Sequence, residues 1–268
     1  MHLNDYLGAV KRWMDEGLRH VTVVGSSQSG AEIVLDLLNR NEDLEVCSLS
    51  RSFSFKHKDL SPFTEQIYMP GFLDYFFNAS GDSQRKMTNE LWHSNYGAAD
   101  PDVIHSLNLI NYEQLVLGRQ RLQIQSNKQI HSVNREESGG YVVAATDIHS
   151  QQKEIFRTDA ILLATGFLNF GEGDAREPML ALMKGLQPKC NFRGDGGVEV
   201  NQDYSLRFTD EGPSTPKVFL NGLCEASHGF GDAGSFSLLW LRSAIIAESI
   251  CETNKRKLNS LSSRAVAQ

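Results

Sequence analysis

Two glycines that follow an apolar run are the residues whose types and spacing point most clearly to chemistry. Gly25 and Gly30 come after the run 21–24 and before a helical pattern of apolar residues that includes Ile33 and Leu37. A strand, a glycine turn and a helix in this order make the first half of a dinucleotide-binding βαβ unit. Gly25 would permit the tight turn, and Gly30 would let helix and strand pack closely. The helix start would then offer free N–H groups to a pyrophosphate.

A second strand candidate, residues 44–49, lies about 20 residues beyond the glycines, where the fingerprint expects the strand that reads the ribose. It is followed by Arg51 rather than by an acidic residue. A carboxylate there would bind a free 2′-hydroxyl, whereas arginine pairs with a 2′-phosphate. We therefore predict NADP rather than NAD; the alternative is that Arg51 is an ordinary solvated charge. The pattern departs from the fingerprint at Ser27, where the middle glycine is expected.

The periodicity along the chain predicts an α/β fold. Apolar spacing indicates helices at 5–17, 71–78, 83–92, 101–118, 179–186 and 236–251. Alternating or short buried runs indicate strands at 122–125, 129–134, 141–146, 154–157, 158–163 and 218–222, and the strand from 158 ends in a turn of small residues. Because the helices after Arg51 interrupt the βαβ rhythm, we interpret residues 62–119 as a helical insertion, which in a nucleotide domain usually carries substrate contacts.

The composition excludes several classes of protein. A net charge of −7 over 268 residues argues against general nucleic-acid binding. The four cysteines have no paired spacing, which excludes a zinc ribbon and suits a reducing cytoplasm, and no metal site is expected. The N-terminus lacks the pattern of a signal peptide, and the apolar stretch 235–250 is too short and polar to span a bilayer. We expect a soluble, cytoplasmic protein without membrane partners.

Five short motifs occur in one order across residues 20–250, and together they resemble a known family. They are Gly25-x-x-Gln28-Ser29-x-Ala31-Glu32, Arg51 followed by Asp59-x-Ser61-Pro62-Phe63, Asn95-Tyr96, Ala164-Thr165-Gly166-Phe167 and His228-Gly229-x-x-Asp232. The sequence resembles the flavin-dependent amine N-hydroxylating monooxygenases of siderophore biosynthesis, which are the L-ornithine N5- and L-lysine N6-monooxygenases. The resemblance does not include the family's first FAD-binding βαβ unit, which would precede Met1.

The resemblance implies both cofactors, NADPH and FAD, and a set of site residues. The residues implied for NADPH are Gly25, Ser27, Gln28, Ser29, Gly30 and Arg51. Those implied near the flavin and the return between domains are Thr165, Gly166, His228, Gly229, Asp232 and Ser235. From the residues alone, His228 beside a glycine is more often a loop hydrogen-bonder than a proton shuttle. Asp232 could be the N-cap of the terminal helix, which does not exclude a flavin contact. No catalytic residue is assigned.

The resemblance also implies that an amine substrate is oxidised with O2. Asn95 matches a family asparagine that hydrogen-bonds the amino-acid substrate. Glu65 stands where ornithine enzymes commonly carry a substrate-contacting asparagine, and its negative charge would favour a second ammonium group. Ornithine, lysine and a diamine therefore stay open as substrates, with ornithine preferred because Asn95-Tyr96 looks more like that branch.

The expected domain organisation follows from these assignments. Residues 1–18 form a linker helix, 19–167 a Rossmann-like NADPH-binding domain with the helical insertion, 168–252 the C-terminal part of an FAD-binding domain, and 253–268 a flexible tail. Without the first FAD-binding unit, the terminal helix would expose an apolar face. Candidate partners are thus an FAD-domain polypeptide or a second copy of this chain.

The sequence leaves open two alternatives to an amine monooxygenase. Ser27 in place of glycine and the missing flavin fingerprint would suit a non-catalytic NADP-binding or assembly module that pairs with a separate flavoprotein. A reductase fragment of the wider group of two-dinucleotide flavoproteins would instead show no dependence on amines.

Overall fold

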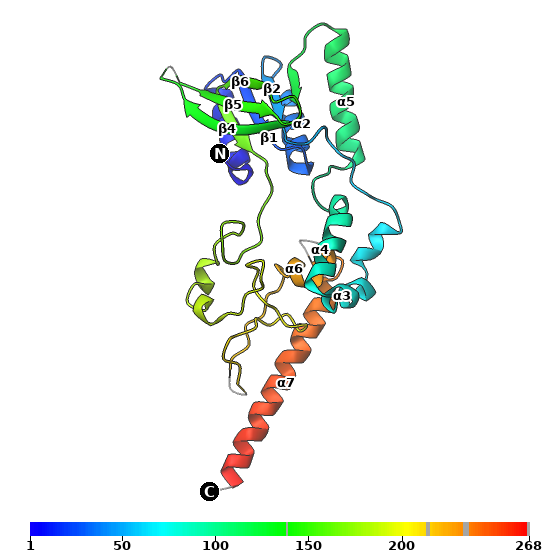
Figure 1. The fold of residues 1–268 in the computed structure, drawn as a ribbon, viewed down its shortest axis with the longest axis vertical. Helices are drawn as coiled ribbons and strands as arrows, with labels where there is room; N and C mark the ends of the chain where they lie inside the picture. The colour runs from blue at the N-terminus through cyan, green and yellow to red at the C-terminus, as the bar shows by residue number, and fades with distance from the viewer. Residues whose placement is uncertain (138, 213–214, 233–235, 267–268) are drawn as a thin grey trace. The chain divides into compact units, whose positions relative to one another are not determined.

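A computed structural model describes residues 1–137, 139–212, 215–232 and 236–266. The chain divides into two units (Figure 1). Unit 1 comprises Met1–Asp59 and Trp92–Gly166, and unit 2 comprises Leu60–Leu91 and Phe167–Gln268. Each unit is therefore assembled from two separate stretches of sequence.

Unit 1 is built on a four-stranded parallel sheet. Its strands are β1 (His20–Val24), β2 (Glu45–Leu49), β3 (Leu122–Gln125) and β7 (Ala160–Leu163), in the order β3-β2-β1-β7. Because β2 and β3 lie on one side of β1 and β7 on the other, the strand order reverses beside β1. Ligands of open α/β sheets bind outside the carboxyl ends of the strands at such a reversal. The expected Rossmann-like fold is confirmed.

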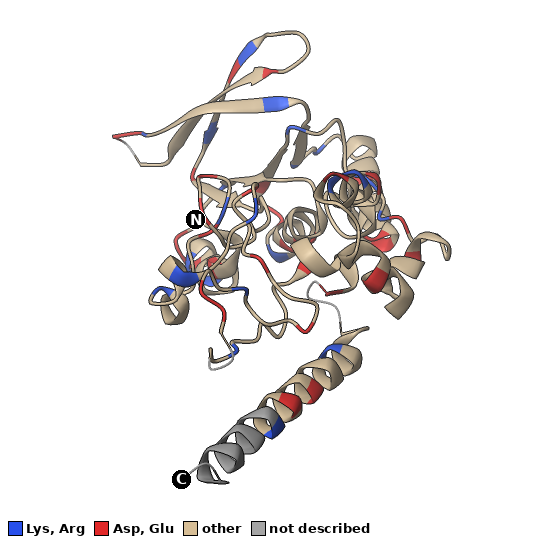
Figure 2. Cartoon of the chain, turned by 60° about the horizontal axis from the view of Figure 1, so that its bottom comes forward, with Lys and Arg blue, Asp and Glu red and all other residues tan. Residues whose placement is uncertain are grey.

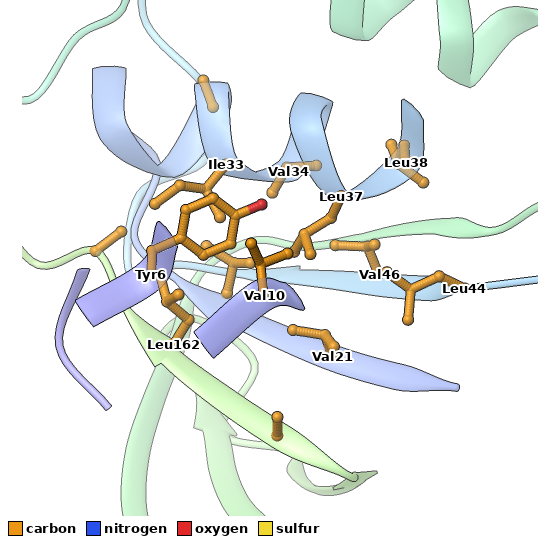
Figure 3. Packing of buried hydrophobic residues seen from close by; sticks show 14 of the residues in the cluster. Tyr6, Val10, Val21, Ile33, Val34, Leu37, Leu38, Leu44, Val46 and Leu162 are labelled. Carbon is orange, nitrogen blue, oxygen red and sulfur yellow. The ribbon is translucent and has the colours of Figure 1, made fainter. Parts of the chain in front are cut away.

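Helices α1 (Tyr6–Asp15) and α2 (Gln28–Arg40) bury their apolar faces in the core of unit 1 (Figure 3). Apolar residues recur at helical spacing, so each helix presents one continuous apolar stripe. Val34 and Leu37 of α2 are fully buried, as is Val23 of β1. Tyr6 donates a hydrogen bond to Asp36 Oδ2, which joins the two helices.

The end of α2 is closed by an arginine from the start of β3. Arg121 Nη1 donates to the carbonyl oxygens of Leu38 (3.3 Å), Asn41 (2.9 Å) and Leu44 (3.3 Å). The last carbonyls of a helix lack partners within the helix, and a cation there also suits the helix dipole. Arg121 therefore fixes where α2 ends relative to the sheet.

Helix α5 (Pro101–Val116) packs against α2 and leads into β3. It is thus the crossover helix between the parallel strands β2 and β3. The sequence analysis had placed this helix in the expected insertion at 62–119. The other helices of that expected insertion, α3 (Pro70–Phe77) and α4 (Gly81–Glu90), belong to unit 2. The region 62–119 is consequently divided between the two units.

A second sheet in unit 1 is antiparallel. It contains β4 (Lys128–Arg135), β5 (Tyr141–Asp147) and β6 (Lys153–Thr158) in the order β4-β5-β6. Gly139 and Gly140 both have positive φ in the β4–β5 turn, as the sequence predicts for this hairpin. Lys128 Nζ donates to Asp147 at 3.1 Å and to Glu154 at 2.5 Å, which links the three strands on one face.

Unit 2 contains little regular sheet. Besides α3 and α4, its helices are α6 (Glu225–His228) and α7 (Leu239–Val266). Its core gathers Leu73 from α3, Leu238 near the start of α7, and the loop residues Tyr204, Leu206 and Leu220. Short 3-10 segments occur in the two units at Leu3–Asp5, Thr64–Tyr68, Trp92–Ser94, Ala181–Met183, Gln187–Lys189 and Phe230–Asp232.

The structure of unit 2 differs from three expectations. The helix expected at 179–186 is reduced to one 3-10 turn, and the strand expected at 218–222 is an isolated bridge between Ser205 and Phe219. Helix α7 continues to Val266, through residues that were expected to form a flexible tail. Among the described residues, no helix is long and apolar enough to cross a membrane.

Gly30→Ala should destabilise the protein, because a Cβ at this position would lie 2.4 Å from the backbone oxygen of Gly25. Overpacking against backbone should lower the free energy of unfolding by about 3 kcal/mol in urea titrations. The matched control is Gly8→Ala in α1, where a Cβ meets nothing within 4 Å. Alanine there should stabilise by about 0.5–1 kcal/mol. Equal midpoints for Gly30→Ala and the unmodified chain would contradict the packing.

Candidate functional site

The turn between β1 and α2 is held in place by two glycines. Gly25 has φ +129° and donates a 3.0 Å hydrogen bond from its N–H to Leu49 O, at the end of β2. A Cβ on Gly25 would lie 2.2 Å from Ala164 O, and one on Gly30 would lie 2.4 Å from Gly25 O. Both positions therefore exclude any side chain.

Helix α2 begins next to this turn with free backbone donors. Ala31 N–H donates to Ser27 O in the first helical bond, whereas Ser29 and Gly30 N–H have no recorded partner within the described part of the chain. A helix N-terminus carries a partial positive charge and exposed N–H groups, which together favour an anion such as a pyrophosphate.

Ser27 does not conflict with this geometry. It is the N-cap of α2 with φ −99° and ψ −170°, an extended conformation that any residue adopts. The serine hydroxyl forms no capping hydrogen bond. The fingerprint's middle glycine is thus not required here by the backbone.

The loop after β7 lies directly beside the glycine turn. Ala164 N–H donates to Val24 O at 2.8 Å, and the exposed residues Thr165 and Gly166 follow. Gly166 has φ +80° and its carbonyl lies 3.5 Å from His2 Nε2. The turn after β1 and the loop after β7 therefore meet at the point where the strand order reverses.

Arg51 is exposed shortly after the end of β2. Within the described residues its guanidinium has no recorded ion pair. The following segment adds Lys56, His57 and Lys58, with Lys58 Nζ 4.0 Å from Asp100 Oδ1. Arg51 thus lies beyond the carboxyl end of β2 with its side chain exposed.

Gln28 is bonded to other residues of unit 1 through both its backbone and its side chain. Its N–H donates to Ala98 O, its Oε1 accepts from Asp100 N–H, and its Nε2 donates to Glu32. The backbone donor of Gln28 is therefore already used, and one side-chain hydrogen remains for a nucleotide.

Asn95 lies half-buried in a turn of unit 1 that follows the 3-10 segment Trp92–Ser94. Tyr96 N–H donates to Trp92 O at 2.8 Å, and the rings of Trp92 and Tyr96 pack with centroids 4.8 Å apart. Glu65 belongs to unit 2, where it is exposed on the 3-10 segment Thr64–Tyr68. The two residues implied for the amine substrate are therefore carried by different units.

The His228 side chain is fully buried in unit 2. Its ring stacks on Tyr204 with centroids 4.1 Å apart, and its Nδ1 lies 2.8 Å from Ser227 Oγ. Burial lowers the pKa of His228 to about 4, so the ring is neutral near pH 7. The ring is thus held by contacts within unit 2. A Cβ on Gly229 would meet the rings of Phe72 and Phe76 at 3.2–3.3 Å.

Asp232 is also fully buried and pairs with Arg242 of α7. Arg242 Nη1 donates to Asp232 Oδ1 at 2.6 Å, and Arg242 Nε donates to Asn221 Oδ1 at 2.8 Å. Burial raises the pKa of Asp232 despite the arginine. Among the described residues, the buried atoms Asp232 Oδ2 and Tyr204 Oη have no hydrogen-bond partner. Ser235, the remaining flavin residue, lies outside the described residues.

The sequence analysis did not identify Arg242 or Tyr204 as residues of the candidate site. Arg242 is the one basic residue in the apolar stretch 235–250, and a charge inside such a stretch signals a buried partner. Tyr204 stands in a loop-rich region with no periodicity, so no local pattern marks it. Among the described residues, no group of three or more His, Cys, Asp or Glu is arranged to hold a metal ion.

Comparisons with known proteins agree on one family. The family model described as L-lysine 6-monooxygenase/L-ornithine 5-monooxygenase matches residues 1–169. An L-ornithine N(5)-monooxygenase of Burkholderia cepacia is 30% identical over 85% of this chain and 50% of its own length. The chain thus spans about half the length of the curated relatives it matches.

Solved structures show the same relationship. The ornithine N-hydroxylase of Kutzneria sp. 744, solved with reduced FAD, NADP⁺ and L-ornithine, superposes with a TM-score of 0.82 at 26% identity, covering 96% of this chain and 58% of that one. The L-lysine 6-monooxygenase of Pseudomonas syringae gives a TM-score of 0.77 at 30% identity, over 94% and 58%.

The buried His228 should make stability depend on pH. Its folded pKa of about 4 lies below the ordinary 6.5, so the unfolded chain binds more protons between these values. The free energy of unfolding should fall by about 3 kcal/mol as pH drops from 6.5 to 4. His228→Gln should remove this part of the pH dependence in urea titrations at both pH values. Parallel curves for the two proteins would count against the neutral buried ring.

Arg242→Met should destabilise the protein strongly, because it leaves the Asp232 carboxylate buried without a counter-charge. Breaking a buried pair in this way costs about 3–5 kcal/mol in the free energy of unfolding. Arg12→Met is the control, since Arg12 and Glu16 form an exposed pair that contributes at most about 1 kcal/mol. Similar losses for both variants would refute the role of the buried pair.

Proposed function

We propose, since this chain belongs to the L-lysine 6-monooxygenase/L-ornithine 5-monooxygenase family, that it supplies the NADPH-binding part of an enzyme that N-hydroxylates the side-chain amine of L-ornithine or L-lysine with O2. The chain spans about half the length of its curated relatives. We therefore propose that unit 2 contributes only part of the flavin domain, and that this chain is inactive without the remainder.

The observation that carries the proposal is the glycine turn at the reversal of strand order. Gly25 and Gly30 bring the start of α2 next to the loop after β7, and the N–H groups of Ser29 and Gly30 bond to no other residue that the structure describes. A pyrophosphate would bind at these donors, and Thr165 and Gly166 would border it. Arg51 would pair with the 2′-phosphate, which selects NADPH over NADH.

Within the part of the chain that the structure describes, unit 2 has a buried acceptor without a hydrogen-bond partner that would suit a flavin. Asp232 Oδ2 is a buried acceptor, and a flavin hydroxyl would satisfy it. His228 and Gly229 would then shape the loop from inside rather than contact the cofactor. When bound, FAD supplies the redox chemistry, accepting a hydride from NADPH and activating O2. Asn95 would orient the amine substrate.

A second candidate function is a nucleotide-binding subunit that pairs with a separate FAD-domain polypeptide. Phe236 and Trp240, at the start of α7, are 84% and 65% exposed, and Ile250 is 43% exposed. Between 239 and 255 this helix carries only four charged residues (Figure 2). Such an apolar face is what a flavin-domain chain would cover.

A diamine substrate is favoured by one local feature of unit 2. The pKa of Tyr68 is raised, first by burial and then by the negative charges of Glu225 and Glu65. Two carboxylates whose charges act on the same phenol would attract a substrate with a second ammonium group better than one with a carboxylate. In the complete enzyme, Glu65→Asn should therefore raise the activity ratio of ornithine to diamine, and an unchanged ratio would argue against this subsite.

Arg51→Ala should weaken NADPH binding by about 10-fold to 100-fold, because a charge-assisted contact to the 2′-phosphate is lost. NADH binding should not change, since NADH has no such phosphate. Fluorescence titration with each nucleotide measures both constants. Arg135→Ala, an exposed arginine on β4, is the matched control and should alter neither. Equal weakening of NADPH binding and NADH binding would contradict the assignment of Arg51 to the 2′-phosphate.

The purified chain should be colourless after incubation with excess FAD and desalting, because most of the flavin site is proposed to lie in the part of the relatives that this chain does not span. Co-expression with the N-terminal half of an ornithine monooxygenase should restore a visible flavin spectrum and ornithine-dependent NADPH oxidation. A flavin band retained by the chain alone would show that this division of the site is wrong. Flavin without amine dependence would favour a reductase.

A further inference from the structure

We infer that Gln28 is a positioning residue that ties the nucleotide-binding turn to the loop carrying Asn95, so that a bound nucleotide holds this loop in place. The inference rests on the proposed function only for the nucleotide; the tie itself is a feature of unit 1. Gln28 would thus act by holding the loop that carries Asn95, and not only by contacting NADPH.

Gln28 binds the segment that follows Asn95 at two points. Its backbone N–H donates to Ala98 O at 2.9 Å, and its side-chain Oε1 accepts from Asp100 N–H at 2.7 Å. The Nε2 group donates to Glu32 Oε1 at 2.7 Å, one helical turn further along α2, which holds the amide in this orientation. The first residue of α2 is thus bonded to a segment about 70 residues away.

The other side of the same segment is bonded to the loop after Arg51. Ala99 N–H donates to Lys56 O at 2.8 Å, and Lys58 N–H donates to Ala99 O at 2.9 Å, which forms a parallel bridge with His57. Residues 98–100 therefore lie between the start of α2 and the loop after β2. These are the two places where the pyrophosphate and the 2′-phosphate of NADPH are proposed to bind.

The Asn95 turn is connected to this segment with little freedom. Gly97, with φ +63°, lies between them, and His93 Nδ1 approaches Tyr96 O at 3.3 Å. Lys56 Nζ lies 3.3 Å from His93 Nε2, so the loop after β2 also touches the turn itself. A nucleotide that holds α2 and Arg51 together would consequently restrict Asn95 from both sides. Losing the acceptor of Gln28 would release one side.

Hydrogen exchange of the whole chain, followed by mass spectrometry with and without NADP⁺, tests the tie. Gln28→Met keeps the length of the side chain but removes the acceptor, so Asp100 N–H should exchange about tenfold faster without nucleotide. Gln28→Glu combined with Glu32→Gln keeps the acceptor for Asp100 N–H and gives position 28 an amide donor at position 32, so the double variant should restore slow exchange. Glu32→Gln keeps an acceptor for Gln28 Nε2 and serves as the matched control, with exchange at Asp100 unchanged.

The nucleotide effect gives the second readout. In the unmodified chain, NADP⁺ should slow exchange both at residues 26–31 and at residues 95–100. In Gln28→Met it should slow exchange at 26–31 as before but slow it less at 95–100, because only the backbone bond to Ala98 and the Lys56 side of the connection remain. Equal exchange at Asp100 in Gln28→Met and the unmodified chain would overturn the tie. If NADP⁺ protects neither segment of the unmodified chain, the proposed function and the nucleotide effect both fail, while the comparison without nucleotide still decides the tie.

Discussion

The close approach of three backbone segments is the constraint on which unit 1 depends. Gly25 lies against Ala164 O, and Gly30 lies against Gly25 O, at distances that leave no room for a Cβ. Because all these atoms belong to the backbone of the sheet, the turn and the helix, none can move alone. This contact sets where α2 starts relative to β1 and β7. It therefore also sets where the free N–H groups at the helix N-terminus lie.

Unit 2 depends on a different kind of constraint, a set of polar side chains in its interior. Asp232 and Arg242 form a buried ion pair, and His228 is stacked on Tyr204. A unit with so little sheet has few backbone ladders to hold its loops. Buried polar groups that must be satisfied take over part of that task. His228 and Asp232, which the resemblance implies as cofactor-binding residues, thus have buried contacts within unit 2.

Local patterns predicted most elements of unit 1 because each one has a strong period and clear ends. The strands β1 to β7, the helices α1 and α2 and the close packing at Gly30 all follow from residues near one another in sequence. Helix α5, which the sequence places in the expected insertion, packs on α2, a partner that is distant in the chain. The strand expected at 218–222 formed only one bridge, since an apolar run does not supply a neighbouring strand.

The sequence by itself determined the α/β class, the glycine turn, the position of Arg51 at the end of β2 and the family. These depend on residue types and short spacings, which act locally. Only the tertiary structure decided that Gln28 is bonded to Asp100, that Asp232 is paired with Arg242, and that residues 60–91 fold with the C-terminal part. Each of these depends on long-range packing and burial, which create partners that no local pattern encodes.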